Sequence, residues 1–195
     1  LLEGQDRFKP FLLPLRSLPV DTGRPKIAVN IYCDSHYRSW LGDHACVTMQ
    51  KLVEADYDCY LVGKSKLVFQ TPDGRMTDLW VGGIYDASGL FGTVEELVAF
   101  LWQMDAVIAP DGGILQLACA MSKPTVGLFG PTRGEQRQRH APYLRALDGE
   151  RDCAPCWCAG DRPPCEGEKC EAMAAFSPER IVETVQQILQ SKETR

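Results

Sequence analysis

The arrangement of apolar and polar positions along the chain predicts strands that alternate with helices. Four segments are short, continuous apolar runs, as expected of strands buried on both faces: KIAVNIY (26–32), CYLVG (59–63), DAVIA (105–109) and TVGLF (125–129). Apolar residues three or four positions apart predict helices over 43–56, 94–103, 113–122 and from Pro178 onward. This order predicts an α/β, Rossmann-like fold: a doubly wound parallel sheet of about five strands with helices on both faces.

The ends of the predicted helices carry recognisable signals. Thr93 and Glu96 have the spacing of a capping box, in which each side chain bonds the backbone of the other residue. Ser177 followed by Pro178 is typical of an N-cap and a first helical position. Asp43 is the expected N-cap of the first helix.

Two stretches have no regular pattern. Residues 1–25 are rich in proline and end in DTGRP, so we interpret them as a linker or strap, or as the tail of a preceding domain. Residues 26–195 then form one domain. Within 64–92, the turn sequence TPDG (71–74) predicts a hairpin between KLVFQ and MTDLWV, with an irregular loop as the alternative.

Composition narrows the classes of partner. The chain has 195 residues, 45% of them hydrophobic and 24% charged, as in ordinary globular proteins. A net charge of −5 argues against nucleic acid as a partner, although a local site for a small anion remains compatible with it. There is no apolar run long enough to span a bilayer and no signal-peptide pattern. We therefore expect a cytoplasmic protein, with a peripheral position on the inner membrane as a variant. Because the first residue is Leu, the sequence is also compatible with a fragment.

Two strand ends carry candidate chemistry, because ligands of doubly wound sheets bind at the carboxyl ends of strands. The loop CDSHYRSW (33–40) follows the first strand, and PDGG (110–113) follows the third. In PDGG the glycines allow close approach of a ligand, and the helix that follows offers unpaired amides suited to a diphosphate. The alternatives are a tight turn with Asp111 as an ordinary N-cap, and a surface Arg38 beside a packed Trp40.

A longer series of motifs favours the ligand-binding interpretation. The stretch 93–132 contains Asp111-Gly112-Gly113, a helix of small and apolar residues, Ser122-Lys123-Pro124 and Phe129-Gly130-Pro131-Thr132. Cys153-Ala-Pro-Cys156, Cys170 and Ser177-Pro178-Glu179-Arg180-Ile181 follow in the same order as in a known family. This series resembles the signature region of the ADP-heptose:lipopolysaccharide heptosyltransferases, glycosyltransferase family 9.

The resemblance implies a GT-B architecture, with two Rossmann-like domains and the site between them. The matched motifs belong to the C-terminal, nucleotide-sugar-binding domain, so residues 26–195 would be that half, with a Cys-rich loop at 151–172. The implied reaction is inverting transfer of a heptose-like sugar from a nucleoside-diphosphate sugar, such as ADP-heptose. The acceptor would be a lipopolysaccharide core or another bacterial glycan, lipid-linked or protein acceptor. In the family an N-terminal domain binds the acceptor and supplies the carboxylate base, and no residue here is assigned as that catalytic group.

The resemblance also implies the donor contacts. Arg38, followed by Ser39 and Trp40, matches the loop with which the family contacts the donor phosphates, a task that suits the planar guanidinium. Two positions depart from the family pattern: Gly112 replaces a hydroxyl residue and Gln116 replaces a histidine. They keep a second hypothesis open, a non-catalytic nucleotide-sugar-binding or interaction module. The predicted donor-binding residues are Arg38, Asp34, Asp111, Gly112, Gly113, Ile114, Gln116 and Thr132.

The nine cysteines form two groups. Four are scattered in apolar segments and are expected to be buried thiols: Cys33, Cys46, Cys59 and Cys119. Five are crowded between Cys153 and Cys170, where four thiolates could hold a structural Zn or Fe. Free thiols and, in an oxidising compartment, disulfides are the alternatives, and a Cys-rich metal protein with an α/β scaffold is a third functional hypothesis. The preferred ligands are Cys153, Cys156, Cys165 and Cys170, with Cys158 as a substitute.

Overall fold

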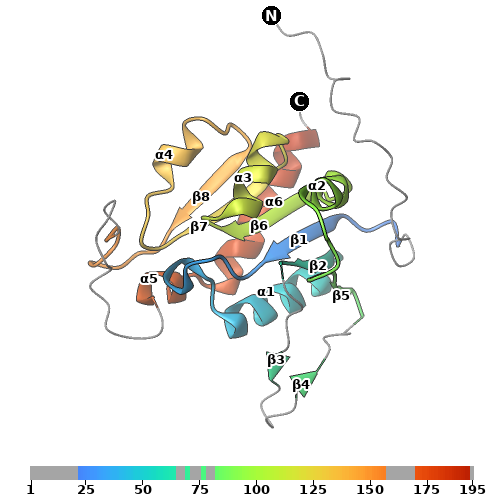
Figure 1. Ribbon diagram of the computed structural model, residues 1–195, viewed down its shortest axis with the longest axis horizontal. Helices are drawn as coiled ribbons and strands as arrows, with labels where there is room; N and C mark the ends of the chain where they lie inside the picture. The colour runs from blue at the N-terminus through green and yellow to red at the C-terminus, as the bar shows by residue number, and fades with distance from the viewer. Residues whose placement is uncertain (1–21, 65–68, 71–75, 78–81, 157–169, 194–195) are drawn as a thin grey trace, which may run out of the picture.

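The computed structural model confirms the α/β class and the parallel sheet (Figure 1). It describes residues 22–64, 69–70, 76–77, 82–156 and 170–193. Six strands form one sheet in the order β5-β2-β1-β6-β7-β8, and every neighbouring pair is parallel. The strands are β1 (Lys26–Asn30), β2 (Asp58–Val62), β5 (Ile84–Asp86), β6 (Ala106–Pro110), β7 (Thr125–Phe129) and β8 (Leu144–Asp148).

The strand order places a switch point in the middle of the sheet. The chain starts at β1, moves outward through β2 to β5, and then returns to the other side of β1 as β6. Connections therefore leave β1 and β6 in opposite directions, which opens a crevice at the carboxyl ends of these two strands. The register there pairs Val29 with Ile108, so Asn30 and Pro110 end the two strands near the same edge.

Helices cover both faces of the sheet. On one face, α1 (Gly42–Glu54), α5 (Glu171–Ala174) and α6 (Pro178–Glu193) enclose a core that includes Trp40, Met49 and Phe176. On the other face, α2 (Val94–Trp102) and α3 (Gly113–Ala120) enclose a second core that includes Tyr60, Phe100 and Phe129. This double coverage explains why β2, β6 and β7 are buried at every position and read as continuous apolar runs.

Two of the three predicted helix starts are confirmed. Thr93 Oγ1 accepts a hydrogen bond from the Glu96 amide at 3.2 Å, and the Glu96 carboxylate accepts one from the Thr93 amide at 3.4 Å. Ser177 Oγ accepts from the Arg180 amide at 3.2 Å, as an N-cap does. The prediction for Asp43 is wrong, because α1 begins one residue earlier and its N-cap is Leu41. Asp43 instead lies in the first turn, where a carboxylate interacts favourably with the helix dipole.

Other parts of the fold were predicted less completely. The hairpin is confirmed by the antiparallel pair β3 (Phe69–Gln70) and β4 (Met76–Thr77), whose turn lies outside the described residues. Strands β5 and β8 and the short helices η1 (His36–Arg38), α4 (Glu135–Gln138) and α5 were not predicted. The proposed linker falls almost entirely outside the described residues.

Of the helices that the structure describes, none combines the length and apolar character needed to cross a membrane.

Candidate donor-binding site

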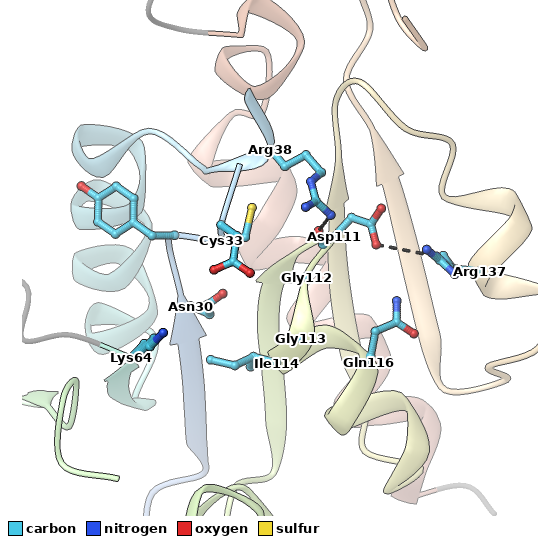
Figure 2. Close-up of a pocket in the computed structure, with 12 residues that line it drawn as sticks. Asn30, Cys33, Arg38, Lys64, Asp111, Gly112, Gly113, Ile114, Gln116 and Arg137 are labelled. Atoms are coloured by element: carbon cyan, nitrogen blue, oxygen red, sulfur yellow. Dashed lines mark hydrogen bonds and ion pairs between the residues drawn. The ribbon is translucent and has the colours of Figure 1, made fainter. Parts of the chain in front are cut away.

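A cavity of about 590 Å³ lies at the carboxyl ends of β1 and β6 (Figure 2). The loop after β1, the β6–α3 turn and α4 contribute its walls. Seven of the eight donor-binding residues predicted from sequence line this cavity, although they come from segments about 75 positions apart: Asp34, Arg38, Asp111, Gly112, Gly113, Ile114 and Gln116.

The first turn of α3 forms the floor of the cavity. Its N-cap is Gly112, and no side chain caps this end of the helix, so Asp111 is not the ordinary N-cap considered as an alternative. A Cβ on Gly112 would lie 3.0 Å from Cys33 Cβ, tighter than normal packing. The glycine therefore lets the loop after β1 approach the start of α3, where the amides and the positive dipole end favour an anion.

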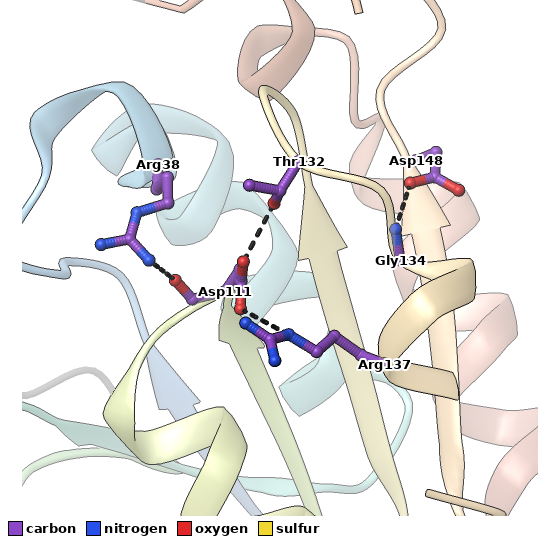
Figure 3. A network of polar contacts seen from close by, with 6 residues as sticks. All are labelled: Arg38, Asp111, Thr132, Gly134, Arg137 and Asp148. Carbon is purple, nitrogen blue, oxygen red and sulfur yellow. Dashed lines mark hydrogen bonds and ion pairs between the residues drawn. The ribbon is translucent and has the colours of Figure 1, made fainter. Parts of the chain in front are cut away.

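Asp111 connects the residues around this turn (Figure 3). The residue is only 4% exposed, and its Oδ2 accepts a hydrogen bond from Thr132 Oγ1 at 3.0 Å. Its Oδ1 lies 3.6 Å from Arg137 Nε, and its backbone carbonyl accepts from Arg38 Nη1 at 2.7 Å. Asp111 thus holds two arginines from distant segments at the cavity.

Thr132 is the predicted donor residue that does not line the cavity. It lies on the other side of the Asp111 carboxylate and lines a second cavity of about 190 Å³, together with Arg133, Glu135 and Asp148. Because its hydroxyl donates to the Asp111 carboxylate, Thr132 stabilises Asp111.

The electrostatics of the cavity favour an anionic ligand. Three cationic side chains line it, Arg38, Lys64 and Arg137, against the carboxylates of Asp34 and Asp111. Asp111 and Arg137 form an ion pair, which leaves Arg38 and Lys64 against Asp34, so the lining carries a net positive charge. This local balance is opposite in sign to the net charge of the chain.

The scattered cysteines are buried less uniformly than predicted. Only Cys59 is fully buried, whereas Cys33, Cys46 and Cys119 are half-buried. Cys33 lines the cavity, and its thiol donates to the Ser35 carbonyl at 3.2 Å. Burial raises the pKa of Cys33, and a hydrogen bond with Ser39 and the charge of Arg38 offset this only in part. Cys33 is therefore a neutral thiol near pH 7.

The sequence analysis missed five residues that line the cavity: Asn30, Tyr32, Cys33, Lys64 and Arg137. Four of them end or follow β1 and β2, so the rule that places ligands at strand ends could have found them. Asn30 also links these strands, because its Nδ2 donates to the Val62 carbonyl at 3.0 Å. No local signal marks Arg137, which lies on a four-residue helix.

The Cys-rich loop is only partly described. Cys153 is exposed, Cys156 is half-buried and Cys170 is buried just before α5. The Cys156 amide donates to the Pro131 carbonyl at 3.0 Å, which ties the start of the loop to the end of β7. Cys158 and the preferred ligand Cys165 lie outside the described residues. Within the described ranges, no group of three or more His, Cys, Asp or Glu side chains could hold a metal ion.

Comparison with protein families identifies the region that contains this site. Residues 83–165 match the model of glycosyltransferase family 9 (heptosyltransferase). This match confirms the family resemblance. The family 9 region extends from β5 into the Cys-rich loop and includes Asp111, α3 and α4. Comparison with curated protein sequences gives no match.

Solved structures support the same fold assignment. The E. coli ADP-heptose lipopolysaccharide heptosyltransferase II is 16% identical, with a TM-score of 0.67 over 90% of this chain and 49% of its own. TibC, an iron-containing dodecameric heptosyltransferase from enterotoxigenic E. coli solved with ADP-D-β-D-heptose, is 16% identical, with a TM-score of 0.67 over 92% and 48%. E. coli heptosyltransferase WaaC with ADP-2-deoxy-2-fluoro heptose is 13% identical, with a TM-score of 0.56 over 87% and 45%. The chain therefore has the fold of one GT-B half and spans about half the length of these proteins.

Proposed function

We propose that this chain is the donor-binding half of a glycosyltransferase that uses a nucleoside-diphosphate sugar, with ADP-heptose as the first candidate. The cavity between β1 and β6 carries this proposal, because a helix start without a side-chain cap borders it together with Arg38 and Arg137, and Lys64 adds a third cation at the opposite end. The family match and the ADP-heptose complex of TibC support the choice of donor.

The residues of the cavity suit binding and stabilisation of a diphosphate. In the proposed reaction an acceptor hydroxyl oxygen attacks the anomeric carbon while the bond from that carbon to the diphosphate oxygen breaks. The diphosphate leaves with the electron pair, and the hydroxyl proton passes to a carboxylate base, which we place in an acceptor-binding domain. The α3 amides and Arg38 would stabilise the charge that develops on the departing diphosphate. Direct attack from the opposite face inverts the anomeric centre.

A second candidate is a binding module without transferase activity. The observation that favours it is the chemistry of two lining residues, Gly112 and Gln116, which stand where the resemblance predicts a hydroxyl and a histidine. Gln116 can hydrogen-bond a ligand but cannot carry charge. Transfer measured with the acceptor domain present separates the two candidates, since both predict donor binding but only the first predicts turnover.

Calorimetry of the 195-residue chain against ADP-, UDP- and GDP-sugars tests donor binding directly. We expect saturable binding of ADP-sugars, with weaker binding of the other two classes. A folded chain that gives no binding heat with any of the three at several temperatures would overturn the proposed function. Binding of UDP- or GDP-sugars in preference to ADP-sugars would retain the donor role and correct the nucleotide.

The Cys-rich loop is proposed to hold a structural Zn or Fe, separate from the reaction. The spacing of its cysteines motivates this proposal, and the iron content of TibC supports it. The described cysteines do not form an assembled site by themselves. The proposed ligand set therefore also needs a cysteine outside the described residues, Cys165 or its substitute Cys158.

A further inference from the structure

Arg137 occupies a position that neither the sequence motifs nor the family resemblance assigns to a ligand. It lines the cavity at the end opposite Lys64, next to Gln116 (Figure 2). Figure 3 shows Arg38 and Arg137 on opposite sides of Asp111. A cation on each side of the same helix start is suited to binding two successive phosphates.

We propose that Arg137 binds the second phosphate of the donor and makes the cavity selective for diphosphates over monophosphates. This inference rests on the proposed function, since it names a specificity residue of the same cavity. In this scheme the α3 amides and Arg38 hold one phosphate, and Arg137 holds the other.

The contacts of Arg137 leave its guanidinium able to bind a ligand. Its Nε faces Asp111 Oδ1 at 3.6 Å, and the Arg137 side chain remains 52% exposed although the Asp111 side chain is 5% exposed. An ion pair through Nε orients the planar group and leaves the two terminal NH₂ groups for a bidentate contact with phosphate oxygens. Asp111 accordingly orients Arg137 with its carboxylate and Arg38 with its carbonyl.

The short helix that carries Arg137 is fixed to the edge strand of the sheet. The Gly134 amide donates to Asp148 Oδ1 at 2.9 Å, and Gln138 Oε1 accepts from the Ala146 amide at 3.0 Å. A Cβ at Gly134 would lie 2.4 Å from Ala146 Cβ, so only glycine allows this close packing. Both ends of α4 are therefore attached to β8. These contacts, rather than the intrinsic stability of a four-residue helix, hold Arg137 at the cavity.

Calorimetry with adenosine, AMP and ADP tests this role in the 195-residue chain and its R137Q variant. R137Q should raise the dissociation constant of ADP about ten- to a hundred-fold, the usual loss for one charge-assisted hydrogen bond. Adenosine and AMP should bind R137Q nearly as they bind the unaltered chain. R137K keeps the charge near Asp111 without the planar fork and should give an intermediate loss for ADP.

Arg139, the C-cap residue of α4, provides the matched control. It pairs with Glu135 at 2.6 Å on the exposed surface and does not line the cavity, so R139Q should leave all three affinities unchanged. Asp148 is a positioning residue here: D148A should weaken ADP binding in the unaltered chain but add nothing in R137Q. A merely structural role would instead give additive losses and equal effects on AMP and ADP.

The outcomes separate this inference from the proposed function. ADP affinity that R137Q leaves unchanged, with nucleotide binding intact, overturns the inference alone. Equal loss of adenosine, AMP and ADP also overturns it, because the effect then lies in the fold of the cavity. If the unaltered chain binds none of the three ligands, the proposed function and this inference fail together.

Discussion

Asp111 shows at the scale of one residue how the fold builds a cavity around a turn. Burying a carboxylate is costly unless it is paired and hydrogen-bonded. Thr132 and Arg137 meet this requirement from a loop and a helix, 21 and 26 positions after Asp111. The same side chain that stabilises the turn therefore also determines where a cation stands in the cavity.

Replacing Arg38 tests the phosphate contact that the sequence predicts. R38A should weaken binding of the nucleotide sugar by about 1.5–3 kcal/mol, because it removes a charge-assisted hydrogen bond. Titration calorimetry with ADP-heptose, the proposed donor, measures this change.

Arg24 is a suitable control for this substitution. It lies before β1, at the opposite end of the sheet, and forms a surface ion pair with Asp56 at 3.3 Å. R24A should leave donor affinity unchanged. If R38A keeps its melting temperature and binds donor as tightly as the unaltered chain, Arg38 does not contact the phosphates.

Cys59 should make the free energy of unfolding depend on alkaline pH. Burial in β2, with a smaller contribution from the neighbouring Asp58 carboxylate, raises the pKa of Cys59 from 9.0 to about 12. The pKa of Cys59 is higher in the folded state than in the unfolded state. The stabilisation that comes from keeping the thiol protonated is therefore fully present below pH 9 and is lost as the pH rises toward 12. The loss approaches about 1.4 kcal/mol per pH unit within this window.

Urea unfolding of C59A and the unaltered chain between pH 8 and pH 11 measures this effect. C59A will be less stable at every pH because it lacks the buried side chain. The informative quantity is therefore the difference between the two proteins in the slope of the free energy of unfolding against pH. Lysines, tyrosines and the other thiols titrate in both proteins and cancel in that comparison. Parallel slopes would show that Cys59 does not remain protonated in the folded state.

At the scale of elements, the Cys-rich loop is expected to be stabilised by a metal rather than by an apolar core. Protein purified without added metal should contain about one Zn or Fe per chain, because one tetrahedral site uses four thiolates. Serine at Cys153 and Cys156 should remove that metal and make the loop 151–172 sensitive to protease, while the sheet stays folded. Elemental analysis and limited proteolysis provide the measurements.

A serine at Cys119 is the matched control for the loop, since this half-buried thiol lies on α3. C119S should retain the metal. Metal-free protein in which every cysteine reacts as a free thiol would contradict the proposed site. Paired disulfides in protein kept under reducing conditions would contradict both the site and the expected cytoplasmic location.

At the scale of the whole molecule, the switch point of the sheet determines where the cavity forms. Lining residues from Asn30 to Arg137 are brought together because β1 and β6 are adjacent in the sheet, although β2 and β5 lie between them in sequence. Three cations, Arg38, Lys64 and Arg137, line the resulting cavity against the carboxylates of Asp34 and Asp111. The chain spans about half of the length of the heptosyltransferases it resembles in fold, so the proposed transfer reaction would also need the proposed acceptor domain.

The sequence by itself determined the elements that are buried on both faces or capped locally. The runs of β1, β2, β6 and β7 are apolar because helices cover both sides, and the Thr93 cap depends only on residues within one turn. Asp111-Gly112-Gly113 by itself was compatible with either a ligand site or an ordinary tight turn, and the longer series of family motifs favoured the site. Arg38 was found through the family resemblance rather than through its neighbours.

Only the tertiary structure decided the edge strands and the second arginine. Strand β8 is buried only at Leu144 and Leu147 and has a neighbour on one side only, while β5 has three residues, so neither produces a long apolar run. Thr132 is directed to Asp111 instead of the cavity, and Arg137 reaches the cavity through contacts of α4 with β8. Such positions depend on which strands pair and which carboxylates are buried. These are properties of residues far apart in the chain, and they arise only when the sheet has formed.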